Sequence, residues 1–398
     1  MDSGSSRLTV PSPIQIKAIR KALGLSQEAF ADRMGCTFTT VNRWENGHRK
    51  PTRLAIFRLE KLSKEAEGTG RLVPIETDLP PRQKELLAVA IQGGVLLLDP
   101  SEPDQALSQN NVHSIPKDLG PVRSVSFDHL YGNPVLLLGT RDGVILQHLS
   151  NDASDIRFPF GHQSGRGYGT NCARINHGYL YATHSEHGLW RWKIDQPTSA
   201  VRLFPEILKS KRTVRSILVL DRERMLFVAD KELYAFAKNA STPDLIHESP
   251  QGARLTSVSL FEHTLYISSS DGRIDSFDLV FRRQQALLSY EQTHLYSALI
   301  VRCMNSPFLV LGTKRPQVLL IGVGDNSERI VYSSGSSNLR LATATNEHVI
   351  ATDHDQNNLI IWEADQPDAP VARIPVAQTL KHHIQDLCVV QFPAGEQT

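Results

Sequence analysis

The side chains best suited to chemistry lie in one short segment, residues 25–47, near the start of the chain. Thr39, Thr40, Asn42 and Arg43 offer hydroxyl, amide and guanidinium groups in close succession. Such groups donate and accept hydrogen bonds, and they are the ones that contact base edges and phosphates in protein–DNA complexes. The segment therefore indicates hydrogen-bonded recognition, with double-stranded DNA as the expected partner.

Four short helices are expected to position these groups within residues 8–66. Helix starts are marked by a capping hydroxyl or a proline, and helix ends by glycine or asparagine. The first helix should start at Ser12-Pro13 and end at Gly24, and the second should start at Ser26 and end at Gly35. The third should start at Thr37 and end at Asn46-Gly47, and the fourth should start at Pro51-Thr52. The apolar residues expected to form the core are Ile16, Ile19, Leu23, Phe30, Met34, Val41, Trp44, Leu59 and Leu62. The pattern predicts a small all-α bundle.

This segment resembles a known family of DNA-binding domains. The order Gly24-Leu25-Ser26-Gln27, Ala31, Val41, Trp44-Glu45-Asn46-Gly47 and Pro51 is similar to that of the phage-repressor (Cro-like, XRE) helix-turn-helix family, over residues 12–62. The resemblance implies that the third helix lies in the major groove and that its early residues face the bases. The alternative is a helix-turn-helix domain that is kept for protein contacts.

The resemblance also implies roles for individual residues. Arg43 would make a bidentate contact with guanine, and Gln27 would lie against a phosphate. Arg20 and Glu45 would form a structural ion pair between the first helix and the end of the third. Phe38 is a departure from the family, and it would either touch a thymine methyl group or pack inward. The expected DNA-binding residues are Gln27, Phe38, Thr39, Thr40, Asn42, Arg43, Asn46, Lys50 and Arg53.

The remainder of the chain, residues 85–398, reads as an all-β fold built from repeats. Short apolar runs alternate with turns such as Arg141-Asp142-Gly143, a strong hairpin signal. Related openings recur about every 40–48 residues, close to the spacing of four-stranded propeller blades. They begin at Val122, Thr170, Val214, Leu255, Leu295, Asn338 and Ile384.

The register at the two ends predicts a closed ring of seven blades. Residues 382–392 supply an opening strand, and residues 86–99 supply the strands that would follow it, so their pairing would close the propeller and remove exposed sheet edges. The region resembles a divergent WD-repeat propeller, with Trp192-Lys193 and Trp362-Glu363 in place of Trp-Asp. Residues 67–84, rich in glycine and proline, are expected to be a linker.

Composition limits the remaining choices. Residues 1–70 carry 12 Lys and Arg against 7 Asp and Glu, so a basic module precedes a slightly acidic body. The four cysteines are scattered, which favours a reducing compartment over a disulfide framework. No apolar run reaches the length of a membrane span, about 18 residues or more. A soluble cytoplasmic protein associated with a bacterial nucleoid is expected.

The body shows no recognisable catalytic motif. No phosphate-binding loop, nucleophile elbow or metalloprotease motif appears, so no enzymatic activity, cofactor or metal is expected. His184-Ser185-Glu186-His187 is interpreted as a hairpin turn rather than a metal site. The glycine-rich segment 160–169 is either a flexible loop between blades or a site for an anion or partner.

Three functions remain open at this stage. The first is a sequence-specific DNA-binding transcriptional regulator whose propeller recognises a protein partner or ligand, acting as a dimer on a two-fold operator or with a partner. The second is a propeller scaffold of a defence or signalling cluster, with DNA binding used for autoregulation or localisation. The third is an enzyme with its site in the propeller channel, which no residue constellation supports.

Overall fold

The structure, a computed structural model, describes residues 11, 13–46, 49–68, 85–103, 112–114, 120–149, 154–161, 169–208, 213–250, 252–279, 283–289, 294–323, 328–335, 338–380 and 383–391. The predicted linker (from residue 69 on) and most of the glycine-rich segment (residues 162–168) lie outside this set. The chain divides into two units, and the boundary between them along the chain falls after Gln83. The units are described separately.

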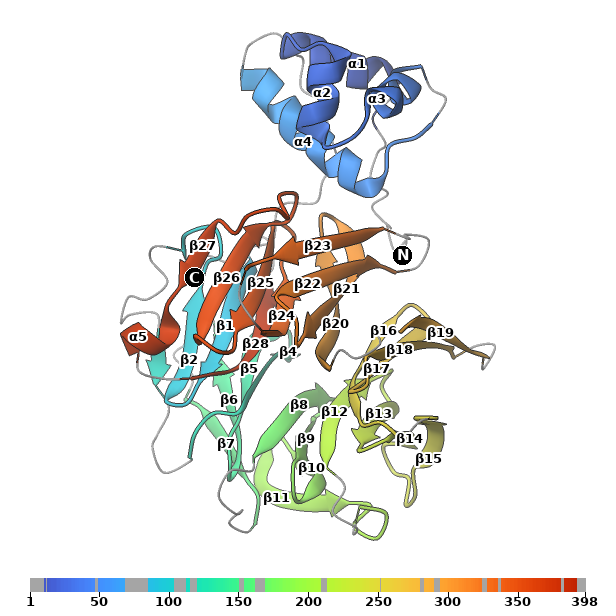
Figure 1. The fold of residues 1–398 in the computed structure, drawn as a ribbon. Helices are drawn as coiled ribbons and strands as arrows, with labels where there is room; N and C mark the ends of the chain where they lie inside the picture. Colours follow the sequence, from blue (N-terminus) through green and yellow to red (C-terminus); the bar gives the residue numbers. More distant parts are fainter. Residues whose placement is uncertain are drawn as a thin grey trace. The chain divides into compact units, whose positions relative to one another are not determined.

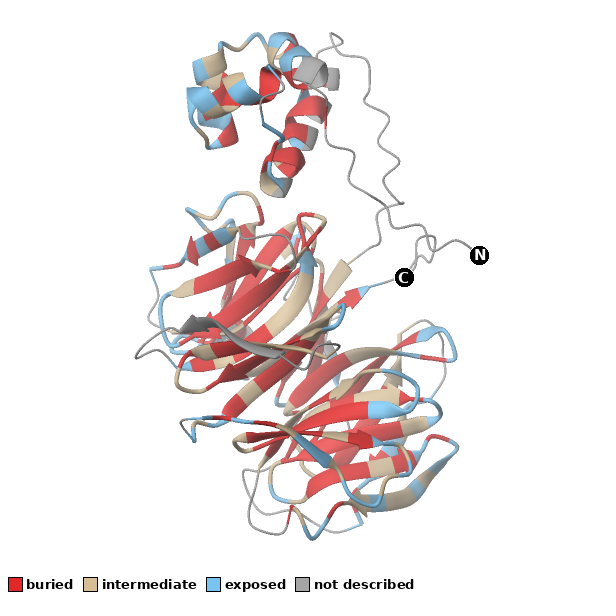
Figure 2. Ribbon diagram, turned by 90° about the vertical axis from the view of Figure 1, so that its right-hand side faces the viewer, coloured by how far each residue is buried: buried red, intermediate tan, exposed pale blue. Residues whose placement is uncertain are grey.

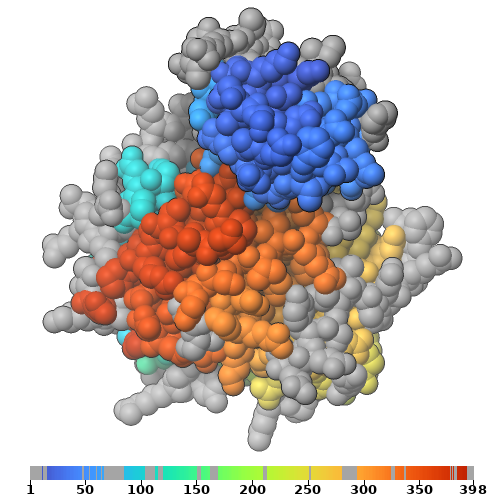
Figure 3. All heavy atoms as spheres, turned by 45° about the horizontal axis from the view of Figure 1, so that its top comes forward, coloured from blue at the N-terminus to red at the C-terminus, as the bar shows by residue number. Residues whose placement is uncertain are grey.

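The first unit is a helical bundle, coloured in blues in Figure 1 and seen as a compact body of side chains in Figure 3. Its helices are α1 (Pro13–Ala22), α2 (Gln27–Met34), α3 (Phe38–Glu45) and α4 (Arg53–Gly68). The hydroxyl groups of Ser26 and Thr37 accept hydrogen bonds from the first turns of α2 and α3, as predicted. Gly35 ends α2 in the left-handed conformation, at φ 61°.

One apolar core holds the four helices together. Its buried members are Ile16, Ile19, Phe30, Ala31, Met34, Val41, Trp44, Ala55, Leu59 and Leu62. These residues recur every three or four positions along each helix, so each helix presents one apolar face to its neighbours. The opposite face of α3 is left to solvent, and it carries the polar residues discussed below.

The second unit is an all-β, propeller-like region of antiparallel sheets, whose strands are bounded as follows. One four-stranded sheet contains β28 (Ile384–Gln391), β1 (Glu85–Ile91), β2 (Gly94–Leu98) and β3 (Val112–Ser114). The next contains β4 (Ser124–Leu130), β5 (Asn133–Gly139), β6 (Gly143–His148) and β7 (Ile156–Pro159). A third contains β8 (Thr170–Asn176), β9 (Tyr179–His184), β10 (Gly188–Lys193) and β11 (Gln196–Leu203).

Two more four-stranded sheets and one larger sheet complete the described strands. The four-stranded sheets are β12 (Val214–Val219), β13 (Arg224–Ala229), β14 (Glu232–Ala237) and β15 (Asp244–Glu248), then β16 (Leu255–Phe261), β17 (Thr264–Ser269), β18 (Arg273–Asp278) and β19 (Arg283–Ser289). The larger sheet contains β20 (Leu295–Cys303), β21 (Ser306–Thr313), β22 (Gln317–Gly322), β23 (Arg329–Ser333), β24 (Leu339–Ala344), β25 (His348–Asp353), β26 (Asn358–Glu363) and β27 (Ala372–Ile374). A short helix, α5 (Val376–Leu380), follows β27.

The larger sheet differs from the sequence-based expectation of seven separate blades. The described strands form five sheets of four and one of eight, because the single residue pair Thr313–Leu339 joins β21 to β24. On either side of that pair, β20–β23 and β24–β27 each repeat the up-and-down order of the other sheets. The strand pair β28–β1 brings the last described strand against the first, with Asp386 opposite Ala90 and Cys388 opposite Ala88.

Apolar side chains fill the space between neighbouring sheets. The cluster between β4–β7 and β8–β11 contains Phe158, Phe160, Trp190 and Trp192, and similar clusters lie between the other neighbouring sheets. Figure 2 shows the resulting concentration of buried residues along the strands. The burial of these faces is the main source of stability in such a fold.

Seven strands lie around the centre of the second unit (Figure 1). They are called the inner strands, and they are β28, β4, β8, β12, β16, β20 and β24. The predicted repeat openings fall at or next to their starts. Polar side chains of one inner strand bond the backbone of the next. These pairs are Asp386 Oδ2 with Val125 N (3.0 Å), Asp128 Oδ2 with Ile175 N (2.8 Å), Asn171 Nδ2 with Val214 O (2.7 Å), Ser257 Oγ with Ala298 O (2.9 Å) and Ser297 Oγ with Arg340 O (3.3 Å). β12 contacts β16, and β24 contacts β28.

Small residues let the sheets crowd towards these strands, as the sequence indicates. A Cβ atom added at Gly312, late in β21, would lie 2.0 Å from the carbonyl oxygen of Arg340 on β24. One added at Gly139, late in β5, would lie 2.7 Å from Cβ of Thr170 on β8. Glycine is therefore required where a second strand passes close to the next inner strand.

One of the linking carboxylates has a raised pKa. Burial raises the pKa of Asp386 from its ordinary 3.8 to about 6, although the N–H groups of Val125 and Leu387 and the charge of Arg174 act in the opposite direction. The residue as a whole keeps some exposed area, whereas its carboxylate is enclosed by protein. Because the folded-state pKa is raised, folding favours the neutral acid.

We expect this carboxylate to make the second unit less stable as the pH rises. Its favourable contribution is complete below the unfolded pKa and is lost as the pH passes through about 6. Asp386→Asn cannot titrate, so its free energy of unfolding should rise relative to the wild type by about 2 kcal/mol between pH 4 and pH 7. Urea unfolding of both proteins across this range measures the difference, and a constant difference would contradict the assignment.

Candidate nucleic-acid interface

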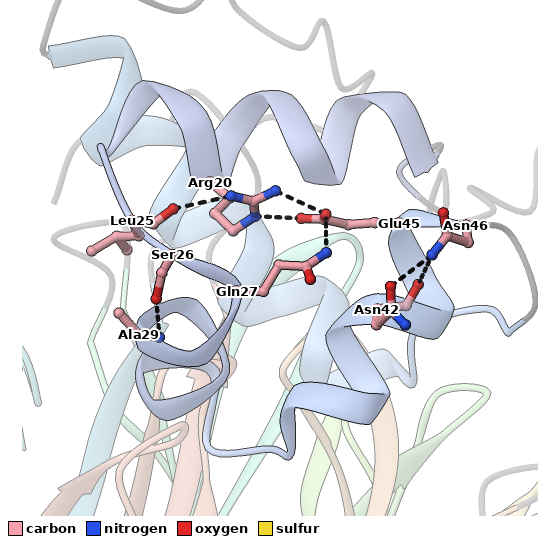
Figure 4. A network of polar contacts seen from close by, with 8 residues as sticks. All are labelled: Arg20, Leu25, Ser26, Gln27, Ala29, Asn42, Glu45 and Asn46. Carbon is pink, nitrogen blue, oxygen red and sulfur yellow. Dashed lines mark hydrogen bonds and ion pairs between the residues drawn. The ribbon is translucent and has the colours of Figure 1, made fainter.

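A buried polar network fixes the end of α3 against α1 and α2 (Figure 4). Arg20 of α1 donates from Nε to Glu45 Oε1 at 2.6 Å and from Nη2 to Glu45 Oε2 at 3.0 Å. Its third group, Nη1, donates to the carbonyl oxygen of Leu25 in the turn before α2 (3.0 Å). The residues that the resemblance pairs, Arg20 and Glu45, are therefore in bidentate contact, and the same guanidinium also holds the entry to α2.

Gln27 joins this network instead of pointing only outward. Its Nε2 donates to Glu45 Oε2 at 2.7 Å, which occupies the amide nitrogen expected to meet a phosphate. The N–H groups of the first turn of α2 do not depend on that side chain, and they remain the anion-binding feature at this helix start. The sequence-based phosphate role of Gln27 thus stays a prediction, now with a second role as a link between α2 and α3.

Glu45 stays ionised in spite of its burial. Its side chain is only 2% exposed. Burial would raise the pKa of the Glu45 carboxyl, but hydrogen bonds from Arg20 and Gln27, with the charges of Arg20 and Lys17, lower it below its ordinary value. The hydrogen bond to Glu45 in turn raises the pKa of Arg20. A charged pair at this depth requires every donor and acceptor to be in place.

The outward face of α3 presents the residues predicted to contact bases. Thr39 and Arg43 are exposed, and Thr40 and Asn42 are half-buried. Thr40 Oγ1 lies 2.9 Å from Thr37 Oγ1, so this hydroxyl is held by the helix cap. All four residues lie on one short helix, α3.

Phe38 is the first residue of α3, and its side chain is 43% exposed. It belongs to no described apolar cluster of the first unit, so of the two expectations the inward-packed one is wrong. An exposed aromatic ring beside Thr39 and Arg43 is available for apolar contact with a thymine methyl group.

The segment after α3 carries further polar and basic groups. Asn46 Nδ2 donates to both the carbonyl oxygen and Oδ1 of Asn42 (2.9 and 2.7 Å), which closes the end of the helix. Lys50 is exposed, and Arg53 begins α4, but its side chain lies outside the described residues. Arg49, exposed and next to Lys50, was not among the predicted site residues; the basic run Arg49-Lys50 is the signal that would have found it.

The other sequence candidates have structural roles in the described residues. The imidazole Nδ1 of His184 accepts hydrogen bonds from the N–H groups of Glu186 and His187 (3.0 and 3.2 Å), so this segment is a hairpin turn as interpreted. Asp353 Oδ1 likewise accepts from its own turn, at Asp355 and Gln356. Among the residues that the structure describes, no group of three or more His, Cys, Asp or Glu could hold a metal ion.

One family of known proteins matches a segment of the first unit. The helix-turn-helix family matches residues 16–62, which covers α1 to most of α4. No curated protein matches the chain. None of the helices in the described ranges is long and apolar enough to cross a membrane.

Several solved structures are similar to the chain at low identity. The computationally designed Ika8 protein is 14% identical, covers 74% of this chain and 88% of its own, and has a TM-score of 0.46. The nidogen/laminin complex is 9% identical (77% and 98% covered, TM-score 0.44). The β-propeller domain of Myceliophteria thermophila Cps50 (Swd1) is 13% identical (64% and 86% covered, TM-score 0.48). Scores at this level say nothing about function.

The Arg20–Glu45 pair predicts a large stability effect in the first unit. Arg20→Ala leaves Glu45 buried without its partner, and it should lower the unfolding free energy of the bundle by about 3 kcal/mol. Arg33 and Glu65 supply a matched control, because they form an exposed pair at 2.7 Å with side chains 43% and 50% exposed. Arg33→Ala should cost under about 1 kcal/mol. Hydrogen exchange of residues 38–45 in the full chain measures both.

The same carboxylate predicts how acid acts on the bundle. Since folding lowers the pKa of Glu45, its contribution is present above the unfolded value and is lost as the pH falls through the folded one. Glu45→Gln does not titrate, and protection of α3 in this variant should fall less with acid than in the wild type. Equal acid sensitivity would show that Glu45 is not the titrating group.

Proposed function

We propose that the protein is a sequence-specific DNA-binding regulator without a catalytic step, in which the second unit senses a ligand or binds a protein partner. The observation that carries the proposal is the outward polar face of α3, held in place by the buried Arg20–Glu45–Gln27 network. The helix-turn-helix match over residues 16–62 supports the same reading.

In this proposal α3 enters a major groove. Arg43 donates to guanine, Thr39, Thr40 and Asn42 contact neighbouring base edges, and Phe38 contacts a thymine methyl group. Lys50, Arg49 and Arg53, with the start of α2 and the backbone at Asn46, face the phosphates. One bundle of this size binds few base pairs, so a dimer on a two-fold site is expected.

We also propose that the second unit is a propeller of seven blades, with β20–β23 and β24–β27 as two of them. Two features support this count: a single residue pair joins the two halves of the eight-stranded sheet, and each half contributes one inner strand. A ring of this kind offers a rigid platform whose remaining sheet edges are short, which suits a sensing or binding role.

The base-reading role predicts a selective loss in one variant. Arg43→Ala should weaken binding to the protein's own genomic sites, identified by genome-wide mapping, by about 1–3 kcal/mol, or roughly 5- to 150-fold. Arg33→Ala removes an equal charge from α2, where Arg33 pairs with Glu65, and it should change affinity far less. Fluorescence anisotropy at one fixed salt concentration compares them.

Two outcomes would contradict the proposal. One is unchanged affinity and sequence preference in Arg43→Ala. The other is an equal loss in both variants, because this would indicate general attraction to phosphates rather than reading of bases by α3.

A further inference from the structure

Five of the seven inner strands have the same feature near their starts: a β-bulge that carries a polar residue. The bulges lie at Asn171 in β8, Arg215 in β12, Thr256 in β16, Arg340 in β24 (with Leu341) and Gln385 in β28. A bulge leaves its residue unpaired in the ladder and redirects its side chain, and bulges are common beside functional sites. These five residues are called the bulge ring.

The bulge ring lies at one end of the inner strands. Asn171 bonds the carbonyl oxygen of Val214, so the starts of β8 and β12 are adjacent. Across the β28–β4 contact, Arg123 Nη1 donates to Gln385 Oε1 at 3.1 Å. Between β24 and β20, the guanidinium carbon of Arg340 lies 4.7 Å from the ring centre of Tyr296.

Three guanidinium groups at this end have unused donors. The Nε atoms of Arg123, Arg215 and Arg340 are buried and have no hydrogen-bond partner among the described residues. A buried donor without an acceptor is costly, so an acceptor that reaches these groups would be favoured. All three are half-buried residues, so an incoming molecule can still reach their side chains.

The surroundings are positively charged. Burial and then the charges of Arg215, Lys314 and Arg340 lower the pKa of His294. This residue precedes β20, and its ring packs at a tilt against Tyr296 (4.5 Å between ring centres). Burial and then Arg254 lower the pKa of Arg215.

Two of the nearby acids are already engaged. Asp230 pairs with Arg254 at 3.2 Å, and Asp355 accepts from Asn338 at 2.9 Å. The unpaired guanidinium donors lie in a positive electrostatic field, and this combination favours binding of an anion.

We propose that the bulge ring, with Arg123 next to Gln385, binds a small phosphorylated anion with two or more phosphate groups through Arg215, Arg340 and Arg123. Guanidinium groups bind phosphate oxygens with paired, charge-assisted hydrogen bonds. Separate cations on different strands favour several phosphates over one. The inference rests on the proposed sensing role of the second unit, because it names the ligand class that this unit takes.

Calorimetric titration of the full chain with tripolyphosphate, pyrophosphate and orthophosphate tests the proposal. Tripolyphosphate should bind at one site per chain, more tightly than pyrophosphate, with orthophosphate weakest. Arg215→Gln and Arg340→Gln should each weaken tripolyphosphate binding at least about tenfold. Arg215→Lys and Arg340→Lys keep the positive charge, so these variants should retain part of the affinity for tripolyphosphate.

The matched control is Arg222→Gln. Arg222 is exposed in the turn at the opposite end of β12, and its loss changes the net charge equally. It should leave tripolyphosphate binding unchanged. Thermal unfolding of each variant checks folding, and tripolyphosphate should raise the midpoint of the wild type and of Arg222→Gln but not of Arg340→Gln.

Three results would overturn the proposal: no binding of tripolyphosphate by the wild type, equal binding by the Arg215→Gln and Arg340→Gln variants, or equal losses in the Arg222→Gln control. Binding of single-stranded oligothymidylate at these arginines without tripolyphosphate binding would also overturn it, because the site would then take a nucleic-acid backbone. Arg43→Ala should lose DNA but keep tripolyphosphate, so failure of this inference and failure of the DNA-binding proposal are distinguishable.

Discussion

The second unit depends on how its inner strands meet without sharing a ladder of backbone hydrogen bonds. Each inner strand has one edge that its own sheet cannot pair, and unpaired backbone groups are costly when they are buried. Side chains supply the missing partners, as Asp386 does for Val125 and Asp128 for Ile175. This need explains why inner strands carry polar residues where a sandwich strand would be apolar. The same need leaves arginines at one end of the ring.

In the first unit, too, polar side chains fix the position of an element relative to its neighbours. The end of α3 must be held at a fixed angle to α1 and α2, and an apolar core alone permits small rotations of a short helix. Glu45 receives three hydrogen bonds from two helices, two from Arg20 and one from Gln27. Directional bonds at low exposure fix one geometry more sharply than packing does. In both units buried polar contacts, rather than apolar burial, set the positions of the residues assigned to recognition.

Local features could be predicted from the sequence, and features that join distant residues could not. The caps at Ser26 and Thr37 and the stop at Gly35 are encoded within one helical turn, so their positions were correct. The bond from Gln27 to Glu45 spans 18 residues, and its competition with a phosphate depends on tertiary geometry. The spacing of the repeats located the inner strands, but the Thr313–Leu339 pair that merges two groups depends on a single contact. The bulge at Arg215 depends on register with β13, which composition does not reveal.

The pairing of β28 with β1 has a consequence for the order in which the chain folds during synthesis. The partner of strand β1, strand β28, is translated almost three hundred residues after β1. This sheet therefore cannot be completed until β28 has left the ribosome. The helical bundle has all its core residues by Leu62, and domains generally fold as units in the order of synthesis. A nascent chain can therefore present a folded bundle while the sheet that contains β1 is still incomplete.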